Sequence, residues 1–477
     1  MSLKAKVLSG TKWVAFANLF KQLLQVLSLI VFARLLTPDD FGLFAILMIF
    51  VNFLLMFTDM GTAAALIHIK SPSQKLLSSI FFFNFFVGIT LFLLLALLSG
   101  PIALFFENPP LKELLGLISI NFVIVSLGIV QKARYEKELD FKNLTLIESA
   151  SVLVGIGVGI AAAYKGLGVY SLVIQTLTTS TLAVVLIWMI AKWRPLLYFS
   201  FGDIKSIWGY TANLTTFNFV NYFARNADNF LIGKFLSSSA LGVYSLAYSI
   251  MLYPLQNISR VLLRILFPAF SHIQDDNEKF KKAYLRTIFF IALVSFPVMV
   301  GLIVTADTLV SLLFGYKWEN LAIILMILAP VGILQSIGTT NGSIYMAKGN
   351  TRLLLKVGIW STIVTIIFFI GGIFFGVEGV ALSYLLSNLV LFYPVFKVSW
   401  EQIGLSVSEG VGTLMPLLVI ASLMGLGVWL LEKVLQPFAF SPLLLLTVMV
   451  LGGILLYLGL IRVKYGKFSI LLSELKR

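Results

Sequence analysis

The stretch FNFVNYFARNADNFLIGKFL (217–236) decides the fold, because it is apolar enough for a membrane helix yet carries an arginine and an aspartate. At 100° per residue, one arc of about 120° contains all of its main polar residues. These are Asn218, Asn221, Tyr222, Arg225, Asp228 and Asn229. An arginine that faces lipid at the bilayer centre costs at least about 2.5–3.5 kcal/mol. The stretch therefore predicts a membrane helix whose polar face lies against protein or a water-filled cavity.

The composition of the whole chain indicates a helical membrane protein. Of 477 residues, 59% are hydrophobic and 12% are charged, whereas soluble proteins carry about 25% charged residues. The apolar runs continue for about 20 residues, a length typical of spanning helices rather than of barrel strands. The chain has no cysteine and only His68 and His272, which excludes thiolate and histidine-cluster metal sites. We expect no cleavable signal peptide, and the net charge of +14 reflects basic loops rather than nucleic-acid binding.

The predicted fold class is an all-α polytopic membrane protein with about 14 spans. The third, fourth and tenth spans are the least clearly defined. The spans are expected near 9–33, 41–67, 77–106, 114–131, 144–164, 168–191, 207–234, 241–264, 284–306, 320–347, 354–375, 378–397, 411–431 and 441–462.

Lysine and arginine residues predict the orientation. With the N-terminus in the cytoplasm, most of the 35 basic residues fall in cytoplasmic segments, which supports two cytoplasmic termini. The opposite face carries only Arg34, Lys112, Lys165, Lys234, Lys317 and Lys433. The longest loop, 265–283, is expected to be a short amphipathic connector. A second connector, 192–206, carries Trp193, Tyr198 and Phe199, which suit a membrane interface.

Two halves of the chain resemble each other. ARLLTPDDFGLFA (33–45) aligns with GKFLSSSALGVYS (233–245), an offset of 233 − 33 = 200, so that Gly42 matches Gly242. Such parallel repeats are related by an axis along the membrane normal. The expected organisation is a six-helix lobe at 1–191, a cytoplasmic linker at 192–206, a second six-helix lobe at 207–400, and two extra helices with a cytoplasmic tail at 401–477.

Further polar stripes occur on the first, second and eighth spans. Because each stripe must avoid lipid, we expect them to line one net-positive cleft between the halves. Arginine suits phosphate oxygens, and amides suit sugar hydroxyls. The predicted substrate-binding residues are Asn18, Lys21, Gln25, Asn218, Asn221, Arg225, Gln256, Arg260 and Arg264. Asp59 and Asp228 are predicted to couple transport to an ion or to form structural ion pairs.

Several of these residues have simpler explanations. Arg225 and Asp228 are three residues apart and can form an ion pair that only holds the helix in place. Arg264 can snorkel to the cytoplasmic surface. Asp59 lies late in its span, before Gly61 and Thr62, and can cap a helix or form a structural pair, whereas Glu148 is expected to pair with a loop lysine. Lys21 has no carboxylate near it in sequence.

The stretches ARLLTPDDFGLFA (33–45), FTDMGTAAALI (57–67) and ARNADNFLIGKFLSSSALGVYSLAY (224–248) resemble the polysaccharide flippases, the Wzx-like transporters. These form one branch of the multidrug/oligosaccharidyl-lipid/polysaccharide exporter superfamily. The resemblance covers about residues 5–400. It implies an inner-membrane, multi-pass protein that is not an enzyme. It also implies alternating access, in which an undecaprenyl-diphosphate-linked oligosaccharide moves from the cytoplasmic to the outer leaflet.

The resemblance further implies a cationic lumen, formed here by Lys21, Arg225, Arg260 and Arg264. Membrane lipids and a lipid-linked oligosaccharide would be its partners, with polysaccharide polymerase and glycosyltransferases in the same pathway and no nucleic acid. No cofactor is expected. Coupling to a proton or sodium gradient is implied for the superfamily, and no motif in the chain specifies the ion.

Three other functions compete with this interpretation. A cation-coupled multidrug exporter of the same fold would favour an acidic, aromatic pocket, yet basic residues within the predicted spans are as numerous as acidic ones. A membrane-embedded glycosyltransferase or polymerase would need a large outer loop, which the predicted spans leave no room for. A scaffold for cell-wall assembly would tolerate loss of the charges within the spans.

Overall fold

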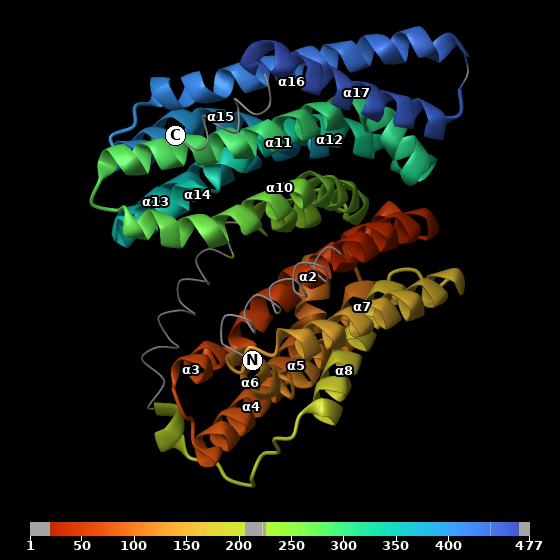
Figure 1. Ribbon diagram of the computed structural model, residues 1–477. Helices are drawn as coiled ribbons and strands as arrows, with labels where there is room; N and C mark the ends of the chain where they lie inside the picture. Colours follow the sequence, from red (N-terminus) through yellow and green to blue (C-terminus); the bar gives the residue numbers. More distant parts are fainter. Residues whose placement is uncertain (1–19, 206–221, 223–225, 439, 467–477) are drawn as a thin grey trace. The chain divides into compact units, whose positions relative to one another are not determined.

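The computed structural model describes residues 20–205, 222, 226–438 and 440–466, without the side chains of 256–269, 271 and 272. The described chain is helical and divides into two compact units, Met1–Gly242 and Val243–Arg477 (Figure 1). The described helical segments of the first unit are residues 20–35, α2 (Pro38–Asp59), α3 (Thr62–His68), α4 (Gln74–Phe105), α5 (Pro110–Ser126), α6 (Ile129–Lys137), α7 (Phe141–Tyr164), α8 (Tyr170–Ile190), residues 201–205 and residues 226–235. Helix α10 (Ser238–His272) begins in the first unit and continues into the second.

After α10, the second unit contains seven described α-helices and two short 3₁₀ helices. These are α11 (Asn277–Leu313), η1 (Tyr316–Trp318), α12 (Glu319–Gly338), α13 (Asn341–Ala347), α14 (Thr351–Ile373), α15 (Gly376–Glu401), α16 (Val407–Leu435), η2 (Gln436–Phe438) and α17 (Pro442–Tyr465). Helix α11 packs against α12, α16 and α17. The last two helices therefore belong to the core of the second unit.

Ten helical segments of the described chain are long and apolar enough to cross a membrane, or eleven if the bent pair α5–α6 is one span. The ten include the third and tenth predicted spans, 77–106 and 320–347, whereas the fourth, 114–131, corresponds to the bent pair. The predicted spans 9–33 and 207–234 lie partly outside the described residues, and 241–264 lies in α10, where many side chains are not described. The total of about 14 and the internal repeat therefore stay predictions, as do the lobe boundaries.

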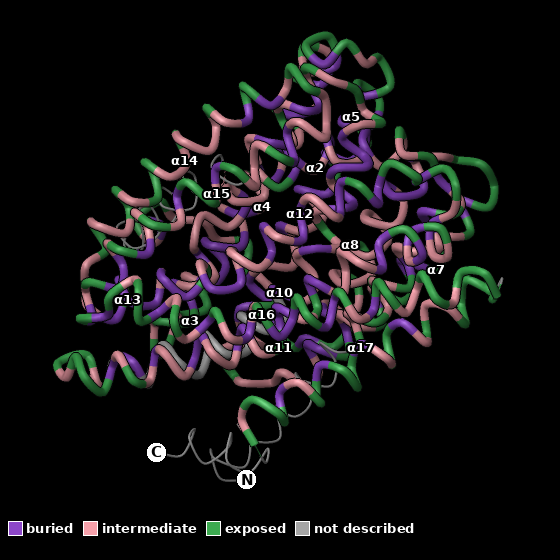
Figure 2. Tube along the Cα trace, turned by 90° about the horizontal axis from the view of Figure 1, so that it is seen from above, coloured by how far each residue is buried: buried purple, intermediate pink, exposed green. Residues whose placement is uncertain are grey.

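The outer surfaces of the helices are apolar, as a lipid environment requires. Leu97, Leu104 and Phe374 are 78%, 80% and 82% exposed. In the most apolar 18-residue segment of α14, only 6% of the residues are buried. Figure 2 shows α14 as largely exposed or intermediate along its length. By contrast, Leu111, Leu115 and the other inward residues of α5 are fully buried. Water would make so much exposed apolar surface unfavourable, whereas a bilayer does not.

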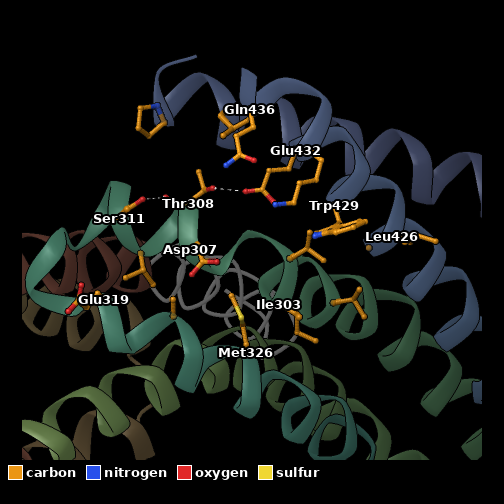
Figure 3. Close-up of a pocket in the computed structure, with 18 of the residues that line it drawn as sticks. Ile303, Asp307, Thr308, Ser311, Glu319, Met326, Leu426, Trp429, Glu432 and Gln436 are labelled. Atoms are coloured by element: carbon orange, nitrogen blue, oxygen red, sulfur yellow. Dashed lines mark hydrogen bonds between the residues drawn. The ribbon is translucent and has the colours of Figure 1, made fainter. Parts of the chain in front are cut away.

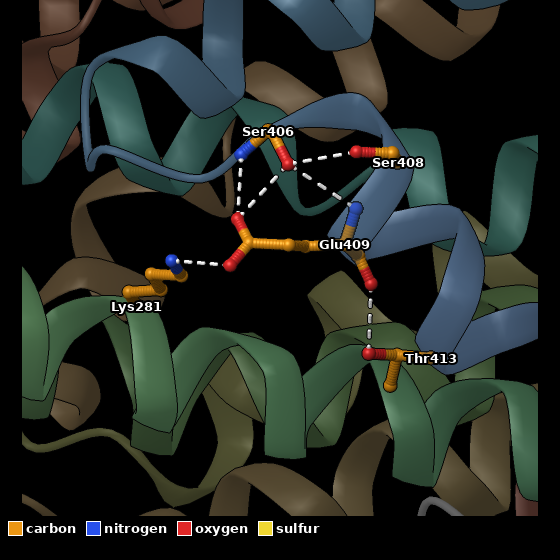
Figure 4. Close-up of polar contacts among 5 residues, drawn as sticks. All are labelled: Lys281, Ser406, Ser408, Glu409 and Thr413. Atoms are coloured by element: carbon orange, nitrogen blue, oxygen red, sulfur yellow. Dashed lines mark hydrogen bonds and ion pairs between the residues drawn. The ribbon is translucent and has the colours of Figure 1, made fainter.

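Local sequence explains where several helices begin. Thr37 and Asp40 form a capping box at the start of α2, with Pro38 at its first position. Ser406 and Glu409 form a second one at the start of α16 (Figure 4). There the Oε1 atom of Glu409 also lies 2.7 Å from Nζ of Lys281, near the start of α11. One carboxylate thus caps α16 and ties it to α11.

Both predicted connectors differ from their expected form. Helix α10 ends at His272 and α11 begins at Asn277, so the connector expected over 265–283 spans only 273–276. In the linker, Trp193 is 7% exposed and packs in a cluster with Phe81 and Ile204, so its expected place at the membrane interface is wrong. The indole was misassigned because aromatic residues suit both interfaces and cores.

The linker is held to the first unit by polar contacts. Ser79 donates to Asp203 at 2.6 Å and accepts from the backbone N–H of Ser200 at 3.1 Å. The Ser78 hydroxyl accepts from the N–H of Leu196 at 2.9 Å. Residues 192–205 are therefore part of the first unit's folded structure rather than a loose tether.

Candidate functional site

A charged network surrounds Lys21, the one predicted basic substrate residue whose side chain the structure describes. Nζ of Lys21 forms an ion pair with Oε2 of Glu148, and Nζ of Lys132 lies 3.0 Å from Oε1 of the same carboxylate. The Lys21 side chain is 17% exposed and that of Glu148 is 32% exposed. Glu148 comes from the second turn of α7 and Lys132 from α6. Glu148 thus pairs with a lysine as expected, but Lys132 lies in the short helix α6 rather than in a loop, and Lys21 is a second partner.

Two more carboxylates lie close to this network. Glu136 is on the same helix as Lys132, one turn later, and interacts electrostatically with Lys132, Glu148 and Asp59. The group formed by Lys21, Lys132, Glu136, Glu148 and Asp59 has two cationic and three anionic side chains. This described part of the predicted site therefore has mixed charge, so any net positive charge of the predicted cleft must come from residues elsewhere in the chain.

Asp59 holds a break between two helices. It is the last residue of α2, and the next two residues, Met60 and Gly61, have φ values of 45° and 81°. The Asp59 carboxylate accepts a hydrogen bond from the backbone N–H of Gly61. Beyond the break, Thr62 and Asn84 exchange hydrogen bonds of 3.0–3.1 Å that attach α3 to α4. The capping role that the sequence allowed for Asp59 is thus present, and its role in ion coupling stays a prediction.

The described end of the 217–236 stretch is packed into the first unit. The Tyr222 hydroxyl donates to the backbone carbonyl of Ile49 at 2.5 Å, and its ring lies 5.7 Å from that of Phe53. Asp228 is only 4% exposed and accepts from the N–H of Asn229 at 2.8 Å. The buried amide oxygen of Asn229 has no hydrogen-bond partner among the described residues. Asp228 is therefore inaccessible to a bulky substrate in this conformation.

The other predicted site residues fall into two groups. Gln25 lies on helix 20–35 and is exposed, and its role in substrate binding stays a prediction. The remaining residues lie outside the described residues or have side chains that are not described: Asn18, Asn218, Asn221, Arg225, Gln256, Arg260 and Arg264. The convergence of these side chains on one cleft stays a prediction.

Two glycines matched in the predicted repeat form a close backbone contact within the first unit. A Cβ atom on Gly42 would lie 1.6 Å from the carbonyl oxygen of Ser238, and one on Gly242 would lie 1.9 Å from that of Pro38. The Ser238 hydroxyl also donates to the Asp39 carboxylate. Gly42 thus contacts Ser238, and Gly242 contacts Pro38, which is the position that corresponds to Ser238 in the predicted repeat. This reciprocal contact is consistent with two equivalent segments. The first turns of α2 and α10 can approach this closely only because both positions are glycine.

Sequence comparison identifies the family. A family model described as "Polysaccharide biosynthesis protein" matches residues 31–323. The chain belongs to this family. It is 30% identical over 437 residues to the lipopolysaccharide biosynthesis protein WzxC of Escherichia coli, covering 89% of each chain. It is 29% identical to the teichuronic acid biosynthesis protein TuaB of Bacillus subtilis, covering 74% of this chain and 73% of TuaB.

The fold also matches a solved structure. The lipid II flippase MurJ in an inward closed conformation superposes with a TM-score of 0.74 at 18% identity, covering 94% of this chain and 98% of MurJ. At this identity the match concerns the fold alone. The match to the family model and to WzxC confirms the resemblance that the sequence motifs indicated. The relatives also agree with the prediction that the chain is not an enzyme.

Sequence reasoning missed Glu148 and Glu136 as members of the candidate site. Glu148 lies 148 − 21 = 127 residues from Lys21, so no local pattern could join them. A signal was present, however: a lone carboxylate two turns into an apolar helix is costly unless a cation lies near it.

Proposed function

We propose that the protein is a flippase for a lipid-linked oligosaccharide. It would move an undecaprenyl-diphosphate-linked repeat unit from the cytoplasmic to the outer leaflet of the plasma membrane by alternating access. The supporting observation is that relatives named for polysaccharide biosynthesis share its sequence over most of its length. The fold shared with a lipid flippase supports the same conclusion.

The proposal assigns substrate recognition to a central cavity to which both halves of the chain contribute. Guanidinium groups would bind the diphosphate, because a planar fork of donors matches phosphate oxygens. Amide groups would bind sugar hydroxyls. The proposed residues are Asn18, Lys21, Gln25, Asn218, Asn221, Arg225, Gln256, Arg260 and Arg264.

The network around Lys21 adds a mechanistic element to this proposal. In the described conformation the Lys21 ammonium is already paired with Glu148. A diphosphate would have to compete with that carboxylate, so binding would exchange one anionic partner of Lys21 for another. Because the lysine would exchange one charge-assisted hydrogen bond for another, its net contribution to binding would be smaller than that of an unpaired lysine.

A transport assay in proteoliposomes tests the proposal. Purified protein is reconstituted with a fluorescent prenyl-diphosphate-linked sugar, and the fraction accessible to an external quencher is followed over time. We expect the double variant Arg225→Ala/Arg260→Ala to lose translocation while it inserts normally. Arg352→Ala, an exposed arginine at the start of α14, is the matched control and should transport normally. Undiminished translocation by the double variant would contradict the proposed site.

A further inference from the structure

The second unit contains a cavity of about 1090 Å³ that the proposed transport function does not use. It is lined by residues of α11, α12 and α16, by the segment between α16 and α17, and by the start of α17 (Figure 3). Its charged residues lie at helix ends. Glu319 is the first residue of α12, Asp307 lies in the last two turns of α11, and Glu432 lies in the last turn of α16. Helix ends of spanning segments lie at the level of lipid headgroups.

The charges that line this cavity differ from those of the chain as a whole. Three carboxylates, Asp307, Glu319 and Glu432, accompany one ammonium group, that of Lys433. The lining therefore has a formal charge of 1 − 3 = −2 in a chain of net charge +14. None of the ion pairs found among the described side chains involves these four residues. The Thr308 hydroxyl donates to Glu432 at 3.3 Å and orients that carboxylate along the wall (Figure 3).

Beyond its charged end the cavity is apolar apart from Ser422, in the middle of α16. Val304, Met326 and Leu426 are among its lining residues, and Trp429, which is 44% exposed, also lines it. Ile333 and Leu418 line both this cavity and a second one of about 230 Å³, whose remaining residues are apolar. The two spaces are therefore adjacent, and an apolar path leads from the charged end into the unit.

We propose that this cavity binds an amine-headed phospholipid, with a phosphoethanolamine headgroup at the charged end and an acyl chain along the apolar path. The headgroup carries a primary ammonium and a phosphate, and the lining offers carboxylates for the first and Lys433 for the second. An ammonium group can donate three hydrogen bonds to carboxylate oxygens. Trp429 suits the boundary between head and chain, since its ring has an apolar body and favours nearby cations.

Charge distinguishes this lipid from other amphiphiles. A polyprenyl phosphate or an anionic glycerophospholipid would bring negative charge to a lining of −2, and the repulsion would oppose binding. A choline headgroup has the same net charge as ethanolamine, but its quaternary ammonium has no N–H to donate. The inference concerns a site separate from the proposed transport cavity, and it stands or falls independently of the transported substrate.

Native mass spectrometry of the purified full-length protein tests the proposal. Lipids with identical dioleoyl chains and ethanolamine, choline or glycerol headgroups are titrated, together with a polyprenyl phosphate. We expect ethanolamine lipid to bind about threefold to tenfold more tightly than the glycerol lipid, because each exposed charge pair contributes modestly. In the double variant Asp307→Asn/Glu432→Gln this ratio should fall to near one.

Two further variants make the result interpretable. Lys433→Gln should weaken binding of every phosphate-bearing lipid by a similar factor. Glu401→Gln removes an exposed carboxylate at the end of α15 that lines neither cavity, and it should retain the wild-type ratio. The single variants Asp307→Asn and Glu432→Gln, with normal elution on gel filtration, replace the double variant if it does not fold. An unchanged ratio in folded variants, or equal or tighter binding of the glycerol lipid or polyprenyl phosphate, would overturn the proposal.

Discussion

Replacement of Gly42 by alanine tests whether the close contact between α2 and α10 is required for function. The added Cβ would lie 1.6 Å from the carbonyl oxygen of Ser238, whereas contacts below 3.0 Å essentially do not occur. The two backbones must therefore separate by at least 3.0 − 1.6 = 1.4 Å. Backbone shifts of this kind typically cost about 1–3 kcal/mol. The gain in helix propensity from glycine to alanine is the same whether or not the contact forms, so it does not offset this cost.

The contact can be measured directly because the chain has no cysteine. Asp39→Cys and Ser238→Cys place two thiols where the native side chains already share a hydrogen bond, and disulfide formation under mild oxidation reports how often the contact is made. A cost of 1–3 kcal/mol should reduce cross-linking about fivefold or more in the Gly42→Ala background. Translocation should fall in the same variant without the added cysteines.

The control for this experiment is Gly157→Ala. Gly157 lies inside α7, and a Cβ there would meet no atom within 4 Å. This variant should cross-link and transport as the wild type does, with a small gain in stability of about 0.5–1 kcal/mol. If Gly42→Ala cross-links at the wild-type rate and transports normally, the steric reasoning is refuted.

Three other predictions follow from contacts of the first unit. Glu148→Gln leaves two lysines without their shared partner, so the free energy of unfolding should fall by about 1–3 kcal/mol and the translocation rate should fall with it. Glu138→Gln breaks an exposed pair and should change the free energy of unfolding by less than about 1 kcal/mol. The pKa of Glu107 is lowered by the hydrogen bond from Lys234, so the pair stabilises the fold at neutral pH and this contribution is lost as pH falls through the lowered pKa. The Tm difference between wild type and Glu107→Gln should therefore vanish in acid, and a pH-independent difference would contradict the assignment. Ser79→Ala removes two hydrogen bonds to the linker, and proteolysis within 192–205 should accelerate about fivefold; an unchanged cleavage rate would show that the linker is held by packing alone.

Much of the candidate site could not be derived from local pattern. The polar stripe of the first span correctly placed Lys21 away from lipid, since an unpaired cation in hydrocarbon is costly. The pattern could not show which group satisfies it. The partner, Glu148, comes from a helix 127 residues later, and only the packing of α7 against the rest of the unit brings the two together.

The sequence by itself determined the class of the protein, its family and the apolar helices that the described residues form, because long apolar runs and local capping residues act over a few turns. It also singled out Gly42 and Gly242 as equivalent positions. Only the tertiary structure decided that these glycines touch, that Trp193 is buried, and that carboxylates gather at one end of α11, α12 and α16. Such contacts join residues far apart in the chain, and their energies depend on three-dimensional packing that no short stretch of sequence specifies.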